Sequence, residues 1–183
     1  MQKKIQWMAE IAIMVALSLA FDYISAMIGG ALWPNGGSIS IAMVPIMVVS
    51  YRWGIRSGLL TGILVGSIQL LWSGGEAAGI VSILFDYIFA YTVVGFAGLF
   101  NNKMKAKPSK TNIWLFCVSM LISFVLRLSS HMVSSMVAYE APFWGALTYN
   151  IGYLGISFIL CSVLIIALFA KAPQIIFKSF PDE

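Results

Sequence analysis

A few polar and ionisable side chains of this sequence lie inside otherwise apolar stretches. The segment SFVLRLSSHMVSSMVAYE, residues 123–140, contains Arg127 and His131, the only histidine of the chain. Residues four apart share one face of a helix, so these two side chains should lie one turn apart on that face. Asp86 and Asn150 stand in two further apolar segments. Charged groups in such surroundings are costly and usually face a cavity or a partner, so these residues are candidates for a binding site.

Aromatic residues accompany these polar ones. Tyr87 follows Asp86, and Tyr149 precedes Asn150. Aromatic faces suit flat rings and cations, and a carboxylate beside them suits an amine or an amidine-like edge. The predicted pocket therefore takes a small, flat, cationic molecule. Four more aromatic residues are expected at or near its mouth: Trp33, Trp72, Tyr139 and Trp144.

Each of these assignments has a plainer alternative. The aromatic residues at the mouth could form only the interfacial belt of a membrane protein. Asp86 could pair with Arg127 as a structural ion pair, and His131 could be a histidine whose hydrogen bonds are satisfied within a helix bundle. Asp22, late in the first apolar segment, could line the mouth, but the sequence alone does not assign it to the site.

The composition indicates the class of protein. Hydrophobic residues make up 60% of the 183 residues and charged residues only 10%, and the mean hydropathy is +0.92, which is typical of a polytopic membrane protein. The formal net charge is +4, but the basic residues border apolar segments instead of forming a patch, so nucleic-acid binding is not expected. Cys117 and Cys161 lie in apolar runs without partner spacing, which predicts neither a disulfide framework nor a metal site.

The apolar segments predict an all-α membrane protein, a compact bundle of six transmembrane helices that forms a single domain over residues 1–183. Spanning a bilayer takes about 20 helical residues, and the second and third segments are short. The basic start and apolar run at the N-terminus resemble a signal peptide, but we expect them to remain as the first helix. The segments run roughly over residues 7–30, 41–53, 55–72, 78–100, 112–139 and 143–171.

The basic residues predict the orientation of the bundle. The positive-inside rule places both termini in the cytoplasm. Asp86 then lies about eight residues, or roughly 12 Å, into its helix from the outer side. His131 and Asn150 lie at a similar depth, and Arg127, the eleventh basic residue, lies one turn deeper than His131. The other ten all flank the segments on one side: Lys3, Lys4, Arg52, Arg56, Lys103, Lys105, Lys107, Lys110, Lys171 and Lys178.

Two further features concern motion and partners. The longest outer connection, residues 31–40, could act as a lid over the pocket or be a plain connecting turn. In the first helix, Ala12, Ala16 and Ala20 repeat every four residues, a pattern that lets another helix approach closely. This alanine row could pack inside the bundle, or it could dock a partner membrane protein, which is the sharper hypothesis.

No feature of the sequence predicts an enzyme. It contains no nucleophile motif and no cluster of His and Cys residues with metal-ligand spacing. It also lacks a P-loop, so it cannot hydrolyse ATP by that route. One outward-facing pocket in a small helix bundle is instead typical of solute capture.

Taken together, these residues resemble the substrate-binding S components of energy-coupling factor (ECF) vitamin transporters, specifically the thiamine-specific type. The resemblance covers nearly the whole chain, including the short-looped helices and the alanine row. The alanine row lies in the segment AIMVALSLA of the first helix. Four further segments carry the resemblance: WPNGGSISIAMVPIMVVSYRWG, FDYIFAYTVVGFAGLF, LRLSSHMVSS and LTYN.

The resemblance implies a high-affinity thiamine receptor in a prokaryotic plasma membrane. It would dock through the alanine row on a transmembrane coupling protein that works with two ATPase subunits. The receptor itself would need no cofactor, because ATP is used only by the partner subunits.

The resemblance also implies roles for single residues. The acidic residue that grips the aminopyrimidine ring of thiamine falls on Asp86, where many members have glutamate, and Tyr87 lies beside it. The histidine of the fifth helix falls on His131, the basic residue one turn earlier on Arg127, and the asparagine of the sixth helix on Asn150.

The aromatic residues match the family less closely. The ring that stacks on the ligand falls on Tyr139, where tryptophan is often seen. A tyrosine is often found five residues before Asn150, but this chain has Gly145 there. Trp144 or Tyr149 could supply the missing ring.

Three rival functions remain from the sequence. One is an S component for another vitamin such as riboflavin, biotin or a pyridoxine-like molecule, although Asp86 argues against an anionic ligand. A second is a solitary thiamine transporter driven by protons through His131 and Asp86. The third is a membrane enzyme or assembly factor, which ligand binding without turnover would exclude.

Overall fold

The structure of the protein is a computed structural model that describes residues 2–29, 33, 37–73, 78–102 and 112–177. Within these ranges every regular element is a helix, and no strand occurs. Three helices come first in the chain: α1 (Gln2–Gly29), α2 (Met43–Trp53) and α3 (Ile55–Ser73). Three more form the C-terminal part: α7 (Asn112–Val137), α8 (Phe143–Lys171) and the short α9 (Pro173–Phe177).

Between α3 and α7 the chain forms one long helical segment, 80–100, whose helix type changes along its length. Runs of π-helix are rare and lie mostly at functional sites, and 3₁₀ runs longer than a turn are uncommon. Segment 80–100 contains both. Its parts are α4 (Ile80–Ser82), the π-helix η2 (Ile83–Phe89), α5 (Ala90–Thr92) and the 3₁₀-helix η3 (Val93–Phe100).

Four of the six predicted segments form helices that are long and apolar enough to cross a membrane. The second predicted segment forms α2, which has 11 residues and extends only roughly 16 Å, against about 30 Å for the hydrocarbon core of a bilayer. The third forms α3, whose apolar part, Ile55–Leu71, is also shorter than the four. Those four are Gln2–Met27, Ile80–Phe100, Ile113–Val137 and Phe143–Lys171.

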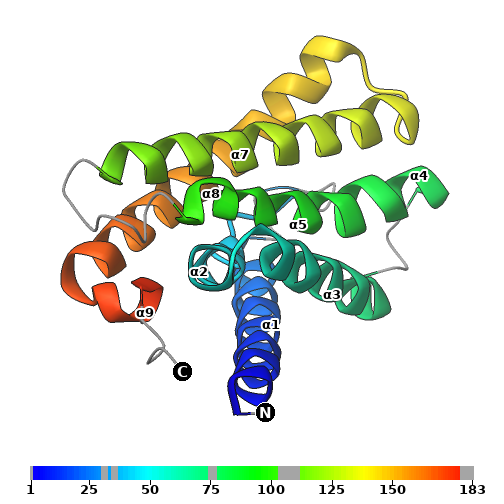
Figure 1. Ribbon diagram of the computed structural model, residues 1–183. Coiled ribbons are helices and arrows are strands. Elements are labelled where there is room, and N and C mark those ends of the chain that lie inside the picture. The colour runs from blue at the N-terminus through cyan, green and yellow to red at the C-terminus, as the bar shows by residue number, and fades with distance from the viewer. Residues whose placement is uncertain (1, 30–32, 34–36, 74–77, 103–111, 178–183) are drawn as a thin grey trace.

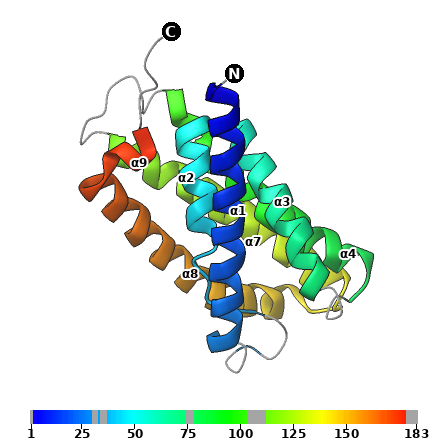
Figure 2. The same ribbon diagram turned by 90° about the horizontal axis from the view of Figure 1, so that it is seen from below.

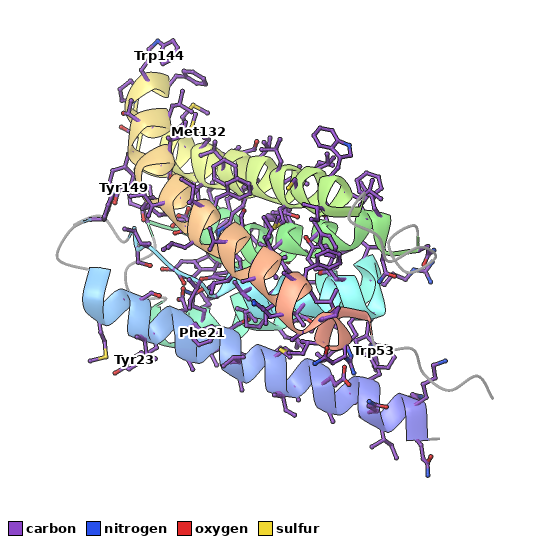
Figure 3. The ribbon with its side chains drawn as sticks, turned by 90° about the vertical axis from the view of Figure 1, so that its left-hand side faces the viewer. Phe21, Tyr23, Trp53, Met132, Trp144 and Tyr149 are labelled. Carbon is purple, nitrogen blue, oxygen red and sulfur yellow. The ribbon has the colours of Figure 1, made fainter. Side chains whose placement is uncertain are left out.

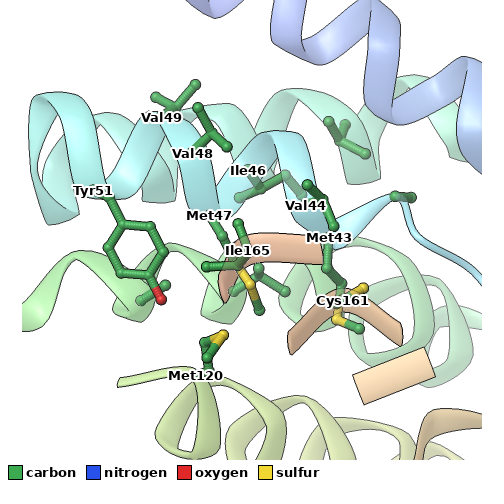
Figure 4. Close-up of a cluster of buried hydrophobic side chains, with 14 of the residues drawn as sticks. Met43, Val44, Ile46, Met47, Val48, Val49, Tyr51, Met120, Cys161 and Ile165 are labelled. Carbon is green, nitrogen blue, oxygen red and sulfur yellow. The ribbon is translucent and has the colours of Figure 1, made fainter. Parts of the chain in front are cut away.

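The short helix α2 lies at the centre of the molecule (Figure 1, Figure 2). It contacts α1, α3, η3, α8 and α9. Every residue from Met43 to Tyr51 is buried, and all of them except Ser50 are apolar or aromatic, as expected for a stretch of helix with no exposed face. Figure 4 shows its side chains against Met120 of α7 and Cys161 and Ile165 of α8.

A row of glycines brings α3 directly against segment 80–100. Gly58, Gly62 and Gly66, which we call the glycine row, repeat every four residues and are buried. A Cβ at Gly66 would lie 2.5 Å from the carbonyl oxygen of Tyr87, and a Cβ at Gly62 would overlap the carbonyl oxygen of Tyr91. Only glycine permits this approach, which fixes the backbone that carries Asp86 and its neighbours.

The end of the molecule with the first residues of α1 is held together by an ion pair. Arg52 Nε lies 2.6 Å from Glu10 Oε2, and Trp53 Nε1 donates to the same oxygen at 2.7 Å. Arg52 Nη1 donates to the carbonyl oxygen of Ile175 at 2.9 Å. These contacts hold α9 at the same end as the start of α1 (Figure 1).

Candidate functional site

A cavity of about 930 Å³ lies between α1, segment 80–100, α7, α8 and the chain that leads into α2. It contains most of the side chains that the sequence singles out. Eight of the nine predicted binding residues line it: Trp33, Asp86, Tyr87, Arg127, His131, Tyr139, Tyr149 and Asn150.

The carboxylate of Asp86 is held by three neighbours. His131 Nδ1 lies 3.0 Å from Asp86 Oδ1, within hydrogen-bonding distance. Ser134 Oγ donates to Oδ2 at 2.5 Å, and Ser82 Oγ donates to the same oxygen at 2.8 Å. A carboxylate offers about four lone-pair positions, so Asp86 can accept one more hydrogen bond from a ligand.

The π-helix η2 carries both Asp86 and Tyr87, and both residues line the cavity. The widened turn of a π-helix changes the direction of the side chains that follow it. The glycine row supports this turn from behind, because Gly66 packs against the carbonyl of Tyr87. No pattern in the sequence predicts this π-helix.

Arg127 does not pair with Asp86, so the structural ion pair considered from the sequence is not formed. Its guanidinium carbon lies 4.2 Å from the centre of the Tyr91 ring, and its Nη1 donates to the carbonyl oxygen of Ala90 at 3.4 Å. The side chain is buried, at 6% exposure, and lines the cavity.

Asn150 is buried and already hydrogen-bonded within the protein. Its Nδ2 donates to Ser135 Oγ and to the carbonyl oxygen of Ala146, both at 2.8 Å. Its Oδ1 accepts from the hydroxyl of Tyr153 at 2.8 Å. Asn150 therefore joins the end of α7 to α8 and fixes Tyr153.

Tyr153 is a cavity residue that the sequence analysis missed. Its ring meets the rings of three predicted residues edge to face, with centroids 6.0 Å from His131, 5.8 Å from Tyr149 and 6.4 Å from Trp33. Edge-to-face pairs at such distances are favourable. Its position one helical turn after Asn150 is the signal that could have identified it.

Trp144 is the predicted residue that the structure does not bring to the cavity. It is 73% exposed, and its ring packs edge to face on Phe143 at 5.3 Å. Figure 3 shows it at the tip of α8, directed away from the other helices, whereas Tyr149 lies closer to them. Five residues turn a helix by roughly 140°, so positions 144 and 149 cannot face the same cavity.

Half of the predicted lid, residues 31–40, falls outside the described residues: 31, 32 and 34–36. The side chain of Trp72, expected near the mouth of the pocket, is not described either. The described end of this connection is tied to the cavity wall. The backbone N–H of Gly37 donates to the hydroxyl of Tyr149 at 3.4 Å, and that of Ser40 donates to Ser157 Oγ at 3.0 Å.

Three buried polar atoms of cavity-lining residues have no hydrogen-bond partner within the part of the chain that the structure describes. They are His131 Nε2, Arg127 Nε and Gln69 Oε1. An unpaired buried polar atom costs about 1–3 kcal/mol, so such atoms commonly mark a place where a ligand or water completes the bonding. The cavity thus keeps hydrogen-bonding capacity for an occupant.

A second carboxylate, Asp22 of α1, also lines the cavity and is only 5% exposed. Its Oδ1 accepts from the hydroxyl of Tyr91 at 2.8 Å and from Ser40 Oγ at 3.1 Å, and its Oδ2 accepts from Gln69 Nε2. Its depth in the first helix could have suggested this position, but the sequence does not tell which face of α1 turns inward.

On the opposite face of α1, all three residues of the alanine row are exposed. Ala16 and Ala20 lie with Leu19 and Tyr23 along a shallow apolar groove. The alanine row therefore does not pack inside the described part of the bundle. Among the same described residues, no group of three or more His, Cys, Asp or Glu side chains could hold a metal ion.

Comparisons with known proteins agree with one another. The family model described as Thiamine transporter protein (Thia_YuaJ) matches residues 8–177. Thiamine transporter ThiT of Bacillus subtilis (strain 168) is 36% identical over 185 residues, which cover 95% of each chain. A solved structure of ThiT from Listeria monocytogenes aligns with a TM-score of 0.78 at 25% identity and covers 96% of this chain and 99% of that one.

Proposed function

The chain belongs to the thiamine transporter protein family, whose model it matches over residues 8–177, and on that premise we propose that it is the thiamine-binding S component of an ECF-type, ATP-driven uptake transporter. It is a membrane protein and a transport protein, not an enzyme. The observation that carries the proposal is the Asp86–His131 pair at the wall of an aromatic-lined cavity. We expect it to bind thiamine without a cofactor of its own.

We propose that Asp86 accepts a hydrogen bond from the amino group of the aminopyrimidine ring. The free lone pair of its carboxylate and the short contacts from Ser82 and Ser134 support this role, because they hold the oxygens in place. His131 Nε2, which has no partner among the described residues, is a second group for the ring edge.

The aromatic side chains of the cavity would enclose the two rings of thiamine. Thiazolium is a cation, and a contact between a cation and the face of an aromatic ring contributes about 0.5–2 kcal/mol of interaction free energy. Trp33, Tyr139 and Tyr149 line the cavity from three different parts of the chain. We propose that these three rings, and not Trp144, stack on the ligand.

We propose further that the chain crosses a prokaryotic plasma membrane six times, with both termini in the cytoplasm. The basic flanks of the helices support this orientation, and the shortness of α2 requires that it cross as part of the buried centre of the bundle. The exposed alanine row and its groove would then dock on a transmembrane coupling protein that carries two ATPase subunits.

Tryptophan fluorescence of the detergent-purified chain tests the ligand. Titration with thiamine should quench the emission saturably, whereas riboflavin should not. The chain has six tryptophans, and Trp33 is the one on the described cavity wall. Trp33→Phe should therefore remove most of the quenching, while the matched change Trp144→Phe should leave it intact. Equal responses to both vitamins would contradict the assignment of thiamine.

A second candidate function is proton-coupled thiamine transport without partner subunits. The direct contact between His131 and Asp86 is the observation that favours it, since such pairs can exchange protons. Proteoliposomes that contain this chain alone, with an imposed proton gradient, distinguish the two. Thiamine uptake into them would support the second candidate, and its absence combined with tight binding would support the first.

A further inference from the structure

Asp22 is a buried carboxylate in a membrane helix for which the site described above gives no role. It is 5% exposed and lines the same cavity as Asp86. Its three hydrogen-bond donors, Tyr91, Ser40 and Gln69, are all neutral groups. Burying an ionised carboxylate is unfavourable unless a positive charge compensates it. A cation close to Asp22 is therefore expected.

No cationic side chain among the described residues pairs directly with Asp22. The guanidinium of Arg127 lies over the face of Tyr91, whose hydroxyl donates to Asp22. Tyr91 therefore contacts both groups, but Arg127 and Asp22 form no ion pair within 4.0 Å. Asp86, in contrast, has a titratable neighbour, the imidazole of His131, at 3.0 Å.

The charges that face the cavity are therefore unbalanced. Its lining contains two carboxylates, Asp22 and Asp86, one guanidinium, Arg127, and the imidazole of His131. With a neutral imidazole and both carboxylates ionised, their sum is one negative charge, which a single cationic ligand would neutralise. The remaining polar lining residues, phenols, hydroxyls and amides, carry no charge at neutral pH.

The two carboxylates are also held at different points of the cavity wall. Asp86 and Tyr91 are five residues apart, more than one helical turn, in segment 80–100, and Asp22 of α1 bonds to Tyr91. That separation suits a molecule with two linked rings, gripped at one ring by Asp86 and facing Asp22 with the other.

We propose that Asp22 supplies the counter-charge for the cationic ring of the ligand and so selects a charged two-ring molecule over a neutral one of the same shape. The proposal rests on the thiamine-binding function proposed above. In thiamine the cationic ring is the thiazolium, whose charge is permanent. Asp22 would act by electrostatic attraction across the cavity, while its bonds to Ser40 and Tyr91 hold it in place.

The test compares thiamine with its neutral analogue, in which thiophene replaces thiazolium, by isothermal titration calorimetry on the full purified chain. Asp22→Asn keeps the size of the side chain and removes its charge. Thiamine affinity should fall about tenfold or more, and affinity for the neutral analogue should change less than threefold. Retained binding of the analogue also shows that the variant is folded.

Two further variants separate charge from structure. Tyr91→Phe keeps the charge of Asp22 but removes one of its hydrogen bonds, so it should weaken both ligands equally. Gln69 donates to Asp22, so the double variant Asp22→Asn with Gln69→Glu moves the carboxylate to the other side of the same hydrogen bond. It should restore at least part of the preference for thiamine.

The outcomes are distinct. A wild-type chain that binds no thiamine overturns the proposed function and this inference with it. A wild-type chain that binds thiamine, with Asp22→Asn weakening both ligands equally or neither, overturns the inference alone and makes Asp22 a structural residue. If Asp22→Asn does not fold, the double variant decides: a preference for thiamine supports the inference, and its loss overturns it.

Discussion

Two helices of this protein carry small residues at every fourth position, and the structure places them in opposite surroundings. The glycine row of α3 is buried against segment 80–100, where it supports the backbone beside Asp86. The alanine row of α1 is exposed along an apolar groove. The spacing indicates that a helix can approach closely, but it does not say whether that helix belongs to the same chain. The glycine row of α3 packs against a helical segment of the same chain. No helix of the described residues covers the alanine row of α1.

The largest effect is expected from a change in the glycine row. Gly62→Val puts a branched side chain where even a Cβ would overlap the carbonyl oxygen of Tyr91, so α3 must move away from segment 80–100. Overpacking of this kind costs about 1–3 kcal/mol or more. We expect a lower midpoint of thermal unfolding and loss of thiamine binding, measured by a thermal-shift assay and calorimetry on the detergent-purified protein.

The matched control is the same kind of change in the alanine row. Ala16→Val adds volume at an exposed position, so stability and thiamine affinity should stay at the wild-type values. If Ala16→Val destabilised the protein as much as Gly62→Val, the contrast between the two rows would be wrong.

The next largest effect tests whether the backbone supported by the glycine row carries the binding site. Asp86→Asn keeps the shape of the side chain but removes the charge that faces the cavity. Because charge-assisted hydrogen bonds are about twice as strong as neutral ones, thiamine affinity should fall about a hundredfold. Calorimetry measures the affinity, and an unchanged unfolding midpoint would show that the fold is intact. Unchanged affinity would move the site away from segment 80–100.

A bulky residue in the alanine row should affect docking but not binding. Ala16→Trp fills the groove formed with Ala20, Leu19 and Tyr23. Thiamine affinity should stay within twofold of wild type, because Ala16 lies outside the described lining of the cavity. Co-purification with a coupling protein and its ATPases should fall at least tenfold. Wild-type recovery of that complex would place the docking surface elsewhere.

The sequence predicts which polar residues line the cavity, because they stand out against an apolar background. Their equal depth on different helices predicts that Asp86 and His131 lie close together, and the two side chains are in contact. Depth could not tell which face of a helix turns inward, so Asp22 was left unassigned. The π-helix around Asp86 depends on close packing against α3, which no single segment encodes.

The smallest effects should separate two aromatic residues of α8 that the sequence treats alike. Tyr149 lines the cavity and accepts a hydrogen bond from Gly37 at 3.4 Å, so Tyr149→Phe should lower thiamine affinity two- to fivefold, as expected for one long neutral hydrogen bond. Trp144 is 73% exposed, so Trp144→Phe should change the affinity less than twofold. Calorimetry on both variants measures the difference. A larger loss for Trp144→Phe would mean that the first turn of α8 moves towards the ligand on binding, so that an exposed residue becomes part of the buried site.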